Sequence, residues 1–392
     1  MKRIPSPLAV LLATTVGSPA GKSSLTKSQS KIPDIQLLRA GAALLVVLCH
    51  GSSELLRTPN AAAIPVLELM SNKGLFGVDI FFVVSGFIMF LISNKRLQEV
   101  GYAGQFLADR IIRIVPLYYL VTTLMICVTI FAPEFKHNNP LNIEYILSSY
   151  CFVPTINPIT KEYQPILGIG WTLNYEMFFY SIFAFGILVF RRRAFYAIIA
   201  ILIGCYIIGR VFHVNQIVFQ SWTKSIILEF MFGIFIARLY TSSWRLPGLI
   251  AALLVAGGAI VWMSVGPSTG GSPYRGFIWG VPAALIVGAL VLSSRDRARE
   301  KGPVFASLIV VGDASYSLYL THLFVMRIFT VIFSHTRLTG IAYTYLYLIV
   351  FTLGAICVAV LSYRYFELPT NRIGHRSLKS WNRNPLTSVS RS

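Results

Sequence analysis

Apolar residues lie along this chain in long continuous runs that are separated by short polar connections. Each run of about 20 residues is long enough to cross roughly 30 Å of hydrocarbon as an α-helix. No run shows the alternation of apolar and polar positions that is typical of a membrane β-strand. The pattern predicts an all-α polytopic membrane protein with about ten transmembrane helices. They are expected near residues 35–55, 75–93, 111–131, 171–190, 195–212, 224–240, 247–265, 276–292, 315–334 and 341–363.

The connections between these runs define three expected regions. Residues 1–33 are expected to form a disordered cytoplasmic N-terminal extension, residues 34–370 a transmembrane domain, and residues 371–392 a basic cytoplasmic tail. The longest connection, about residues 133–170, contains Pro133, Pro140, Pro154, Pro158 and Pro165 and predicts a partly ordered outer loop. The sequence shows no internal repeat and no appended soluble domain.

The composition supports a membrane protein and argues against nucleic-acid binding. Only 12% of the residues are charged, against roughly 25% in soluble domains. The formal net charge of +19 comes from basic residues at the ends of apolar segments, not from one soluble face. The five cysteines are scattered and show neither a disulfide framework nor metal-ligand spacing. No metal cofactor is therefore expected.

The distribution of basic residues predicts the orientation of the chain. With the N-terminus inside, 24 Lys and Arg residues fall on the cytoplasmic side and nine on the outer side. An excess of basic residues marks cytoplasmic loops, so both termini are expected in the cytoplasm. The alternative is a secretory signal peptide, because Lys2 and Arg3 precede the apolar segment Leu8–Val16 and small residues follow it. Cleavage there would invert the orientation.

Two residues in the first apolar segment, Arg39 and His50, are the first candidates for a functional site. An ionisable side chain inside the bilayer is costly, and it is a functional candidate by default. The two are eleven positions apart, so they share one helix face about 16 Å apart along the axis. Arginine suits phosphate binding and histidine suits proton transfer. The alternative is an interfacial Arg39 and a His50 that only joins neighbouring helices.

Two carboxylates could join His50 in a catalytic site. Glu176 follows Trp171 at the start of the fourth apolar segment, at a depth similar to that of His50. A carboxylate at that depth could orient the imidazole or act as a base. Asp79, near the outer end of the second segment, is the other candidate. Glu176 could instead face an outer vestibule, and Asp79 could instead be an interfacial carboxylate at a helix start.

The cytoplasmic side carries candidates for anion binding. Arg110 and Arg113 are three positions apart and therefore neighbours on one helix surface. They could bind the phosphates of a nucleotide-like cofactor or simply anchor the helix. Ser315, Tyr316 and Ser317 begin the ninth segment, where they could line a cavity or join helices by hydrogen bonds. His322 on the same segment is a weaker catalytic candidate than His50.

Six motifs in chain order resemble those of the membrane-bound acyltransferase-3 family, and within it the bacterial exopolysaccharide O-acetyltransferases. Each motif alone is weak, but their order over residues 34–370 is specific. The motifs are the Arg39 and His50 pair, Gly77–Phe87, Arg110–Tyr118, Trp171–Tyr180, Gly312–Leu320 and Tyr363–Pro369.

The resemblance implies O-acyl transfer from cytoplasmic acetyl-CoA, as acyl-donor substrate, to a hydroxyl of an exported carbohydrate. The protein would reside in the bacterial inner membrane, within the lipid bilayer, with polysaccharide synthesis or export proteins as further partners and without nucleic acid. His50, Glu176 and Asp79 are the expected catalytic residues. The expected acyl-CoA-binding residues are Arg39, Arg110, Arg113, Ser315, Tyr316 and Ser317.

Two other classes of function fit the residues alone. A transporter of a lipid-linked sugar or small molecule could use the buried Arg, His and Glu as its substrate or proton path. A scaffold for a polysaccharide synthesis complex would have no chemistry of its own. Acetyl transfer by the purified protein distinguishes the enzyme from both.

Overall fold

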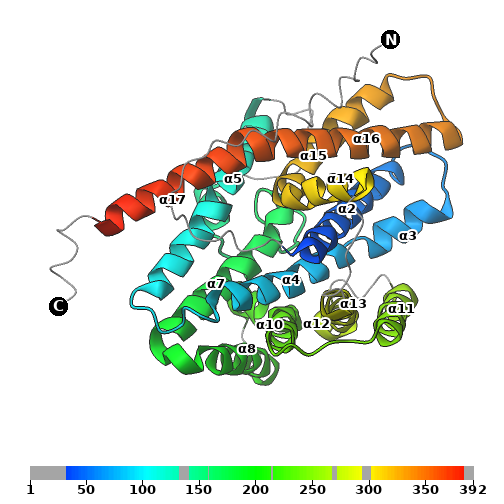
Figure 1. Cartoon of the computed structure of the whole chain (residues 1–392). Helices are drawn as coiled ribbons and strands as arrows, with labels where there is room; N and C mark the ends of the chain where they lie inside the picture. Colours follow the sequence, from blue (N-terminus) through cyan, green and yellow to red (C-terminus); the bar gives the residue numbers. More distant parts are fainter. Residues whose placement is uncertain are drawn as a thin grey trace, which may run out of the picture. The chain divides into compact units, whose positions relative to one another are not determined.

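The structure, a computed structural model, describes residues 32–131, 141–157, 159–212, 215–266, 272–293 and 302–383. These residues are almost entirely helical and contain no β-strand (Figure 1). Residues 1–31 of the predicted N-terminal extension, residues 133–140 and 158 of the predicted outer loop, and residues 384–392 of the predicted tail lie outside the described residues. The all-α prediction is confirmed.

The ten predicted segments all fall on helices. These helices are α2 (Pro33–Leu55), α4 (Phe76–Ser93), α5 (Tyr102–Phe131), α7 (Trp171–Phe190), α8 (Ala194–Val211), α10 (Leu228–Thr241), α11 (Gly248–Ser264), α13 (Gly280–Ser293), α15 (Ser315–Ser334) and α16 (Gly340–Ser362). Within the described residues, seven helical stretches are long and apolar enough to cross a membrane. Helix α10, with 14 residues, and α11, with 17 residues, are shorter than the roughly 20 residues of a full span. A total of about ten spans therefore stays a prediction.

The structure contains further helices that the apolar pattern did not predict. They are α3 (Pro65–Lys73), α6 (Ile143–Tyr150), α9 (Ile217–Trp222), α14 (Pro303–Asp313) and α17 (Leu368–Arg383), with short 3₁₀ turns at Gly168–Gly170 and Arg191–Arg193. The short helix α12 (Arg275–Ile278) and the 3₁₀ turn Ser225–Ile227 lie at the starts of the predicted segments 276–292 and 224–240. Helix α14 packs against α2 (Figure 1). A π-helical turn, Tyr363–Glu367, joins α16 to α17, so a helix continues through the start of the predicted tail.

Helix α2 is central to the arrangement, because it packs against α3, α4, α14, α15 and α16. Its buried face consists largely of small and β-branched residues, including Ala40, Ala43 and Val47. These pack against Leu318 and Phe351 in one apolar core. This packing fixes the rotation of α2 and, with it, the directions of Arg39 and His50.

Helices α4 and α10 approach each other closely at two glycines. A Cβ atom added to Gly233 would lie 2.0 Å from the carbonyl oxygen of Val83, and one added to Gly86 would lie 2.0 Å from that of Phe230. Small residues allow helix backbones to come this close in membranes. The contact holds α4, and therefore Asp79 and Ser85, in place beside α2.

Candidate active site

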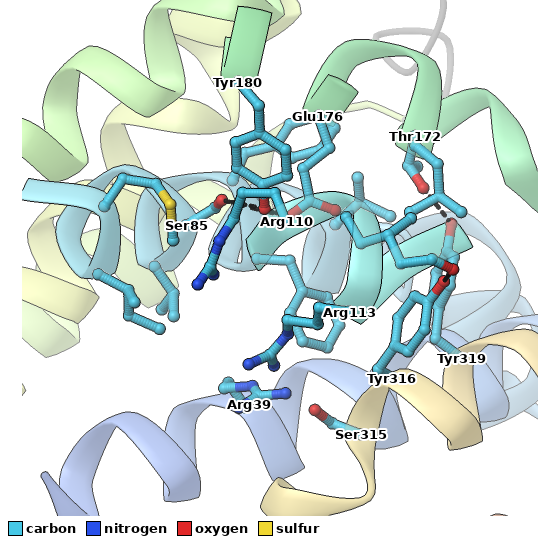
Figure 2. Close-up of a pocket in the computed structure, with 18 residues that line it drawn as sticks. Arg39, Ser85, Arg110, Arg113, Thr172, Glu176, Tyr180, Ser315, Tyr316 and Tyr319 are labelled. Carbon is cyan, nitrogen blue, oxygen red and sulfur yellow. Dashed lines mark hydrogen bonds between the residues drawn. The ribbon is translucent and has the colours of Figure 1, made fainter. Parts of the chain in front are cut away.

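Six of the predicted site residues line one cavity, which we call the arginine pocket. Its polar lining comes from α2, α4, α5, α7 and α15 (Figure 2). The cavity has a volume of about 100 Å³. It lies toward the start of α2, α5 and α15, the ends predicted to face the cytoplasm. The predicted residues that line it are Arg39, Arg110, Arg113, Glu176, Ser315 and Tyr316.

The arginine pocket is strongly cationic. In Figure 2 the guanidinium of Arg113 points toward that of Arg39, although like charges repel each other. Arg39 is 9% exposed, and its Nη1 donates a hydrogen bond to Gln36. The buried Nε of Arg110 and the buried Oγ of Ser315 have no hydrogen-bond partner within the described part of the chain. An anion in this pocket would satisfy such groups and offset the repulsion.

Glu176 is held on the wall of the arginine pocket. Its Oε1 accepts hydrogen bonds from the hydroxyls of Ser85, at 3.2 Å, and Tyr180. Ser85 and Tyr180 are also within 3.3 Å of each other. These contacts orient the carboxylate, but they do not connect it with His50. The expected pairing of Glu176 with His50 is therefore not formed in this structure.

Ser317 lies apart from Ser315 and Tyr316. Its hydroxyl is fully buried and donates to the carboxylate of Glu367 at 2.7 Å. The hydroxyl of Tyr316 donates to the backbone carbonyl of Ile114, while Ser315 lines the arginine pocket. Ser317 thus joins α15 to the π-helical turn after α16, as the alternative interpretation of this segment expected.

His50 lines a second cavity, which we call the histidine pocket. It has a volume of about 580 Å³ and lies at the opposite end of α2. Residues of α2, α15 and the segment 160–171 surround it, including Glu54, Glu162 and Trp171. Arg39 and His50 therefore lie on the same helix but line two different cavities.

The contacts of His50 assign its tautomer. Its Nδ1 lies 2.9 Å from the carbonyl oxygen of Val46, which can only accept, so Nδ1 carries the hydrogen. The same nitrogen lies 3.2 Å from Nε2 of His322. Nδ1 of His322 in turn faces the carbonyl of Leu318 at 3.1 Å. Neutral His50 therefore keeps an unshared electron pair on Nε2, to which none of the described residues hydrogen-bonds.

A hydrogen-bonded partition lies between the two pockets. The hydroxyl of Tyr319 donates to the carbonyl of Ile169 at 2.9 Å and lies 2.9 Å from the hydroxyl of Thr172. Tyr319 and Thr172 line the arginine pocket, whereas Ile169 lines the histidine pocket. A group that passes directly from one pocket to the other must displace the hydroxyl of Tyr319 from these hydrogen bonds or go around it.

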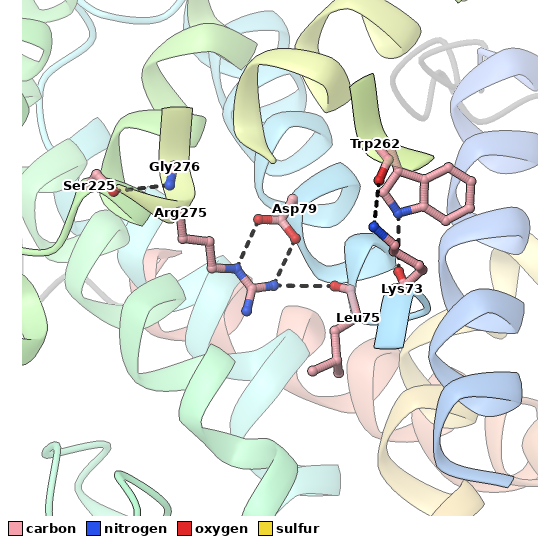
Figure 3. Close-up of polar contacts among 7 residues, drawn as sticks. All are labelled: Lys73, Leu75, Asp79, Ser225, Trp262, Arg275 and Gly276. Atoms are coloured by element: carbon pink, nitrogen blue, oxygen red, sulfur yellow. Dashed lines mark hydrogen bonds and ion pairs between the residues drawn. The ribbon is translucent and has the colours of Figure 1, made fainter. Parts of the chain in front are cut away.

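Asp79 is paired with an arginine of a distant segment. The side chain of Asp79 is fully buried, and both of its oxygens accept from Arg275, at 3.0 and 2.7 Å (Figure 3). Arg275 also donates to the carbonyl of Leu75. A buried ion pair between two helices positions the helices relative to each other. A catalytic role for Asp79 stays a prediction, and this geometry favours positioning.

Several residues of these networks were not predicted from the sequence as parts of a site. Arg275 directly precedes the predicted segment 276–292 and is only 5% exposed. Glu229 is fully buried on α10 and belongs to the same cluster of charges as Asp79. An acidic residue inside an apolar segment was the available signal for Glu229. The partition formed by Tyr319 has no sequence signal, because its partners Ile169 and Thr172 are 150 and 147 positions away in the sequence.

Comparisons with known proteins agree with the motifs. Residues 32–364 match the model of acyltransferase family 3, described as an acyltransferase domain, so the chain belongs to this family. Because the described residues include seven apolar helical stretches long enough to cross a membrane, it is a multi-pass membrane acyltransferase. The chain is 36% identical over 260 residues to the exopolysaccharide production protein ExoZ of Rhizobium meliloti (strain 1021), which covers 65% of this chain and 77% of that protein. No solved structure matches the chain.

Proposed function

We propose that this protein transfers an acetyl or other acyl group from cytoplasmic acyl-CoA to a hydroxyl of an exported carbohydrate such as exopolysaccharide. The family supports acyl transfer, and the relative ExoZ is named as an exopolysaccharide production protein. The observation that carries the proposal is the placement of a cationic pocket and a histidine pocket at opposite ends of α2. The family match does not favour the transporter interpretation.

The arginine pocket would hold the phosphate-bearing part of the donor. Arg39, Arg110 and Arg113 supply the positive charge, and Ser315 supplies a hydroxyl without a described partner. At about 100 Å³ the pocket is smaller than the roughly 300–1,000 Å³ of sites that enclose a whole ligand. We therefore place only a phosphate or the thin pantetheine chain inside it, with the nucleotide toward the cytoplasm.

The histidine pocket would hold the acceptor sugar. Nε2 of His50 takes the proton of the acceptor hydroxyl while the oxygen attacks the thioester carbonyl carbon. The carbon–sulfur bond then breaks, the acyl group is transferred to the sugar oxygen, and the CoA thiolate receives the proton. The unshared pair of Nε2 also suits direct attack on the thioester, in which case His50 carries the acyl group. Trapping of acyl-histidine distinguishes the two routes.

His322, Glu176 and Asp79 would support the site without touching the reacting atoms. When Nε2 of His50 gains a proton, Nδ1–H donates to Val46 and to the lone pair of His322, and both contacts stabilise the imidazolium. Glu176 would balance the charge of the arginines and face the donor. Asp79 would position α4 through Arg275.

The proposal includes a bacterial inner-membrane location with about ten spans and both termini in the cytoplasm. This orientation gives the arginine pocket access to cytoplasmic acyl-CoA and the histidine pocket access to the exported carbohydrate. Other proteins of polysaccharide synthesis or export would supply that carbohydrate.

The test compares the polysaccharide of cells that lack the gene with that of cells expressing the wild type or His50→Ala. The expected NMR spectrum shows O-acyl signals only with the wild type. His335→Ala, which changes an exposed histidine at the end of α15, is the matched control and should restore the signals. Normal acylation by His50→Ala in intact, membrane-inserted protein would refute the proposal.

A further inference from the structure

A third cavity adjoins the histidine pocket, and we call it the side pocket. It has a volume of about 320 Å³ and is lined by the start of α7, residues 154–155 and 162–164, the end of α9 and the connection between α9 and α10. The two cavities have four lining residues in common, which makes them neighbours around one wall. These residues are Leu75, Glu162, Gln164 and Trp171.

Two buried polar groups in the side pocket have no partner in the described part of the chain. Asn174 is 4% exposed and Ser221 is 3% exposed. Neither Oδ1 of Asn174 nor Oγ of Ser221 has a hydrogen-bond partner there, and both residues line the cavity. Burial of a polar atom without a partner is unfavourable and calls for an explanation. A ligand with hydroxyl groups would satisfy both atoms.

The rest of the lining fits an uncharged ligand with apolar faces. Trp171 and Tyr175 meet edge to face at 5.9 Å, and Tyr163 is fixed by its hydrogen bond to Gln220. The charge of Arg275 is already paired with Asp79 (Figure 3). Lys224 and Glu162 contribute one charge of each sign. Aromatic rings beside a few fixed polar groups are typical of a site for a neutral, polar small ligand.

We propose that the side pocket is a carbohydrate subsite. It would bind a sugar residue next to the one whose hydroxyl is acylated at His50, with Asn174 and Ser221 as hydrogen-bonding partners. This inference rests on the proposed function. Because the two cavities adjoin at Trp171, one oligosaccharide can occupy both, and the enzyme would then select acceptors of at least two sugars.

The experiment measures acyl transfer by the purified full-length protein to two kinds of acceptor. One kind is the repeat-unit oligosaccharide of the host exopolysaccharide, and the other is the methyl glycosides of its single sugars. Ser221→Ala and Asn174→Leu should raise the KM for the oligosaccharide about five- to tenfold each, as expected for one lost hydrogen bond. The KM for the methyl glycosides should not change.

Thermal stability separates binding from a structural role. Removal of an unpartnered hydroxyl should leave the melting temperature of Ser221→Ala unchanged or higher, so a KM effect would not come from unfolding. Ser264→Ala, on the exposed side of α11, is the control and should behave as the wild type. Equal KM values of wild type and both variants for the oligosaccharide would overturn the subsite while transfer itself persists. A wild type that acylates neither acceptor would overturn both proposals.

Discussion

His50 of α2 and His322 of α15 form a pair that links the two helices. They are 272 positions apart in sequence but hydrogen-bond at 3.2 Å. The lone pair of His322 faces Nδ1 of His50, and the carbonyl of Val46 shares that hydrogen. His322 therefore acts as a positioning residue, which fixes the ring of His50 and leaves its Nε2 for chemistry.

Replacement of His322 tests this role. His322→Phe should lower kcat roughly 10- to 100-fold with little change in KM, because displacement of a catalytic group by about 1 Å costs on the order of 100-fold. His322→Gln keeps an acceptor and should restore part of the activity. A steady-state comparison of the two variants decides it. Equal losses in both variants would indicate a packing role instead.

Replacement of the arginines in the arginine pocket tests whether they bind the phosphates of the donor. Arg110→Gln or Arg113→Gln should raise the KM for acetyl-CoA roughly 10- to 100-fold, the cost of one charged hydrogen bond. The KM for acetyl-pantetheine, which lacks the nucleotide phosphates, should change little. Arg192→Gln, at an exposed arginine between α7 and α8, is the control. An equal effect on both donors would show that the arginines do not bind the phosphates.

Much of the residue pattern of the site was predictable, and the exceptions have physical reasons. Arg39 and Glu176 were identified because a charge inside an apolar segment is costly. Ser315 and Ser317 were expected to bind the same ligand. Two positions on a helix differ in direction by about 200°, so the two side chains cannot both face the arginine pocket. Asp79 could not be distinguished from a catalytic acid, because its partner, Arg275, is 196 positions away.

At the scale of elements, the close contact of α4 with α10 places the cavity walls. Gly233→Leu should prevent this packing, because its Cβ would lie 2.0 Å from the carbonyl oxygen of Val83. We expect a lower melting temperature and a lower yield of inserted protein. Gly257→Leu on α11 is the control, since no atom lies within 4 Å of the added Cβ. Equal stability of both variants would contradict the packing described for α4.

The long apolar helices were predicted because their length and hydropathy suffice. Helix α14 was not predicted, since its 11 residues are too few to cross the bilayer, and only its packing against α2 accounts for its position. Helix α17 was predicted as a basic tail because its composition is polar. Its contact with α5, including His375 with Asp109 at 3.2 Å, depends on the folded arrangement.

In the whole molecule, transfer from cytoplasmic acyl-CoA to an exported carbohydrate requires the two pockets to face opposite sides of the membrane. A reporter fused after Ser392 that is active only in the periplasm should remain inactive, because the basic residues predict a cytoplasmic C-terminus. A reporter fused within residues 159–167 of the predicted outer loop should be active. The opposite pattern would support the signal-peptide interpretation and would place the arginine pocket on the wrong side for acyl-CoA.

The most direct test of the central claim is acyl transfer by purified protein in lipid vesicles. The measurement follows label from [¹⁴C]acetyl-CoA into the repeat-unit oligosaccharide, together with release of free CoA, for wild type, His50→Ala and His335→Ala. We expect transfer by the wild type and by His335→Ala. For His50→Ala we expect a loss of at least about 100-fold, the usual contribution of a general base. Undiminished transfer by correctly folded His50→Ala would refute a catalytic role of His50.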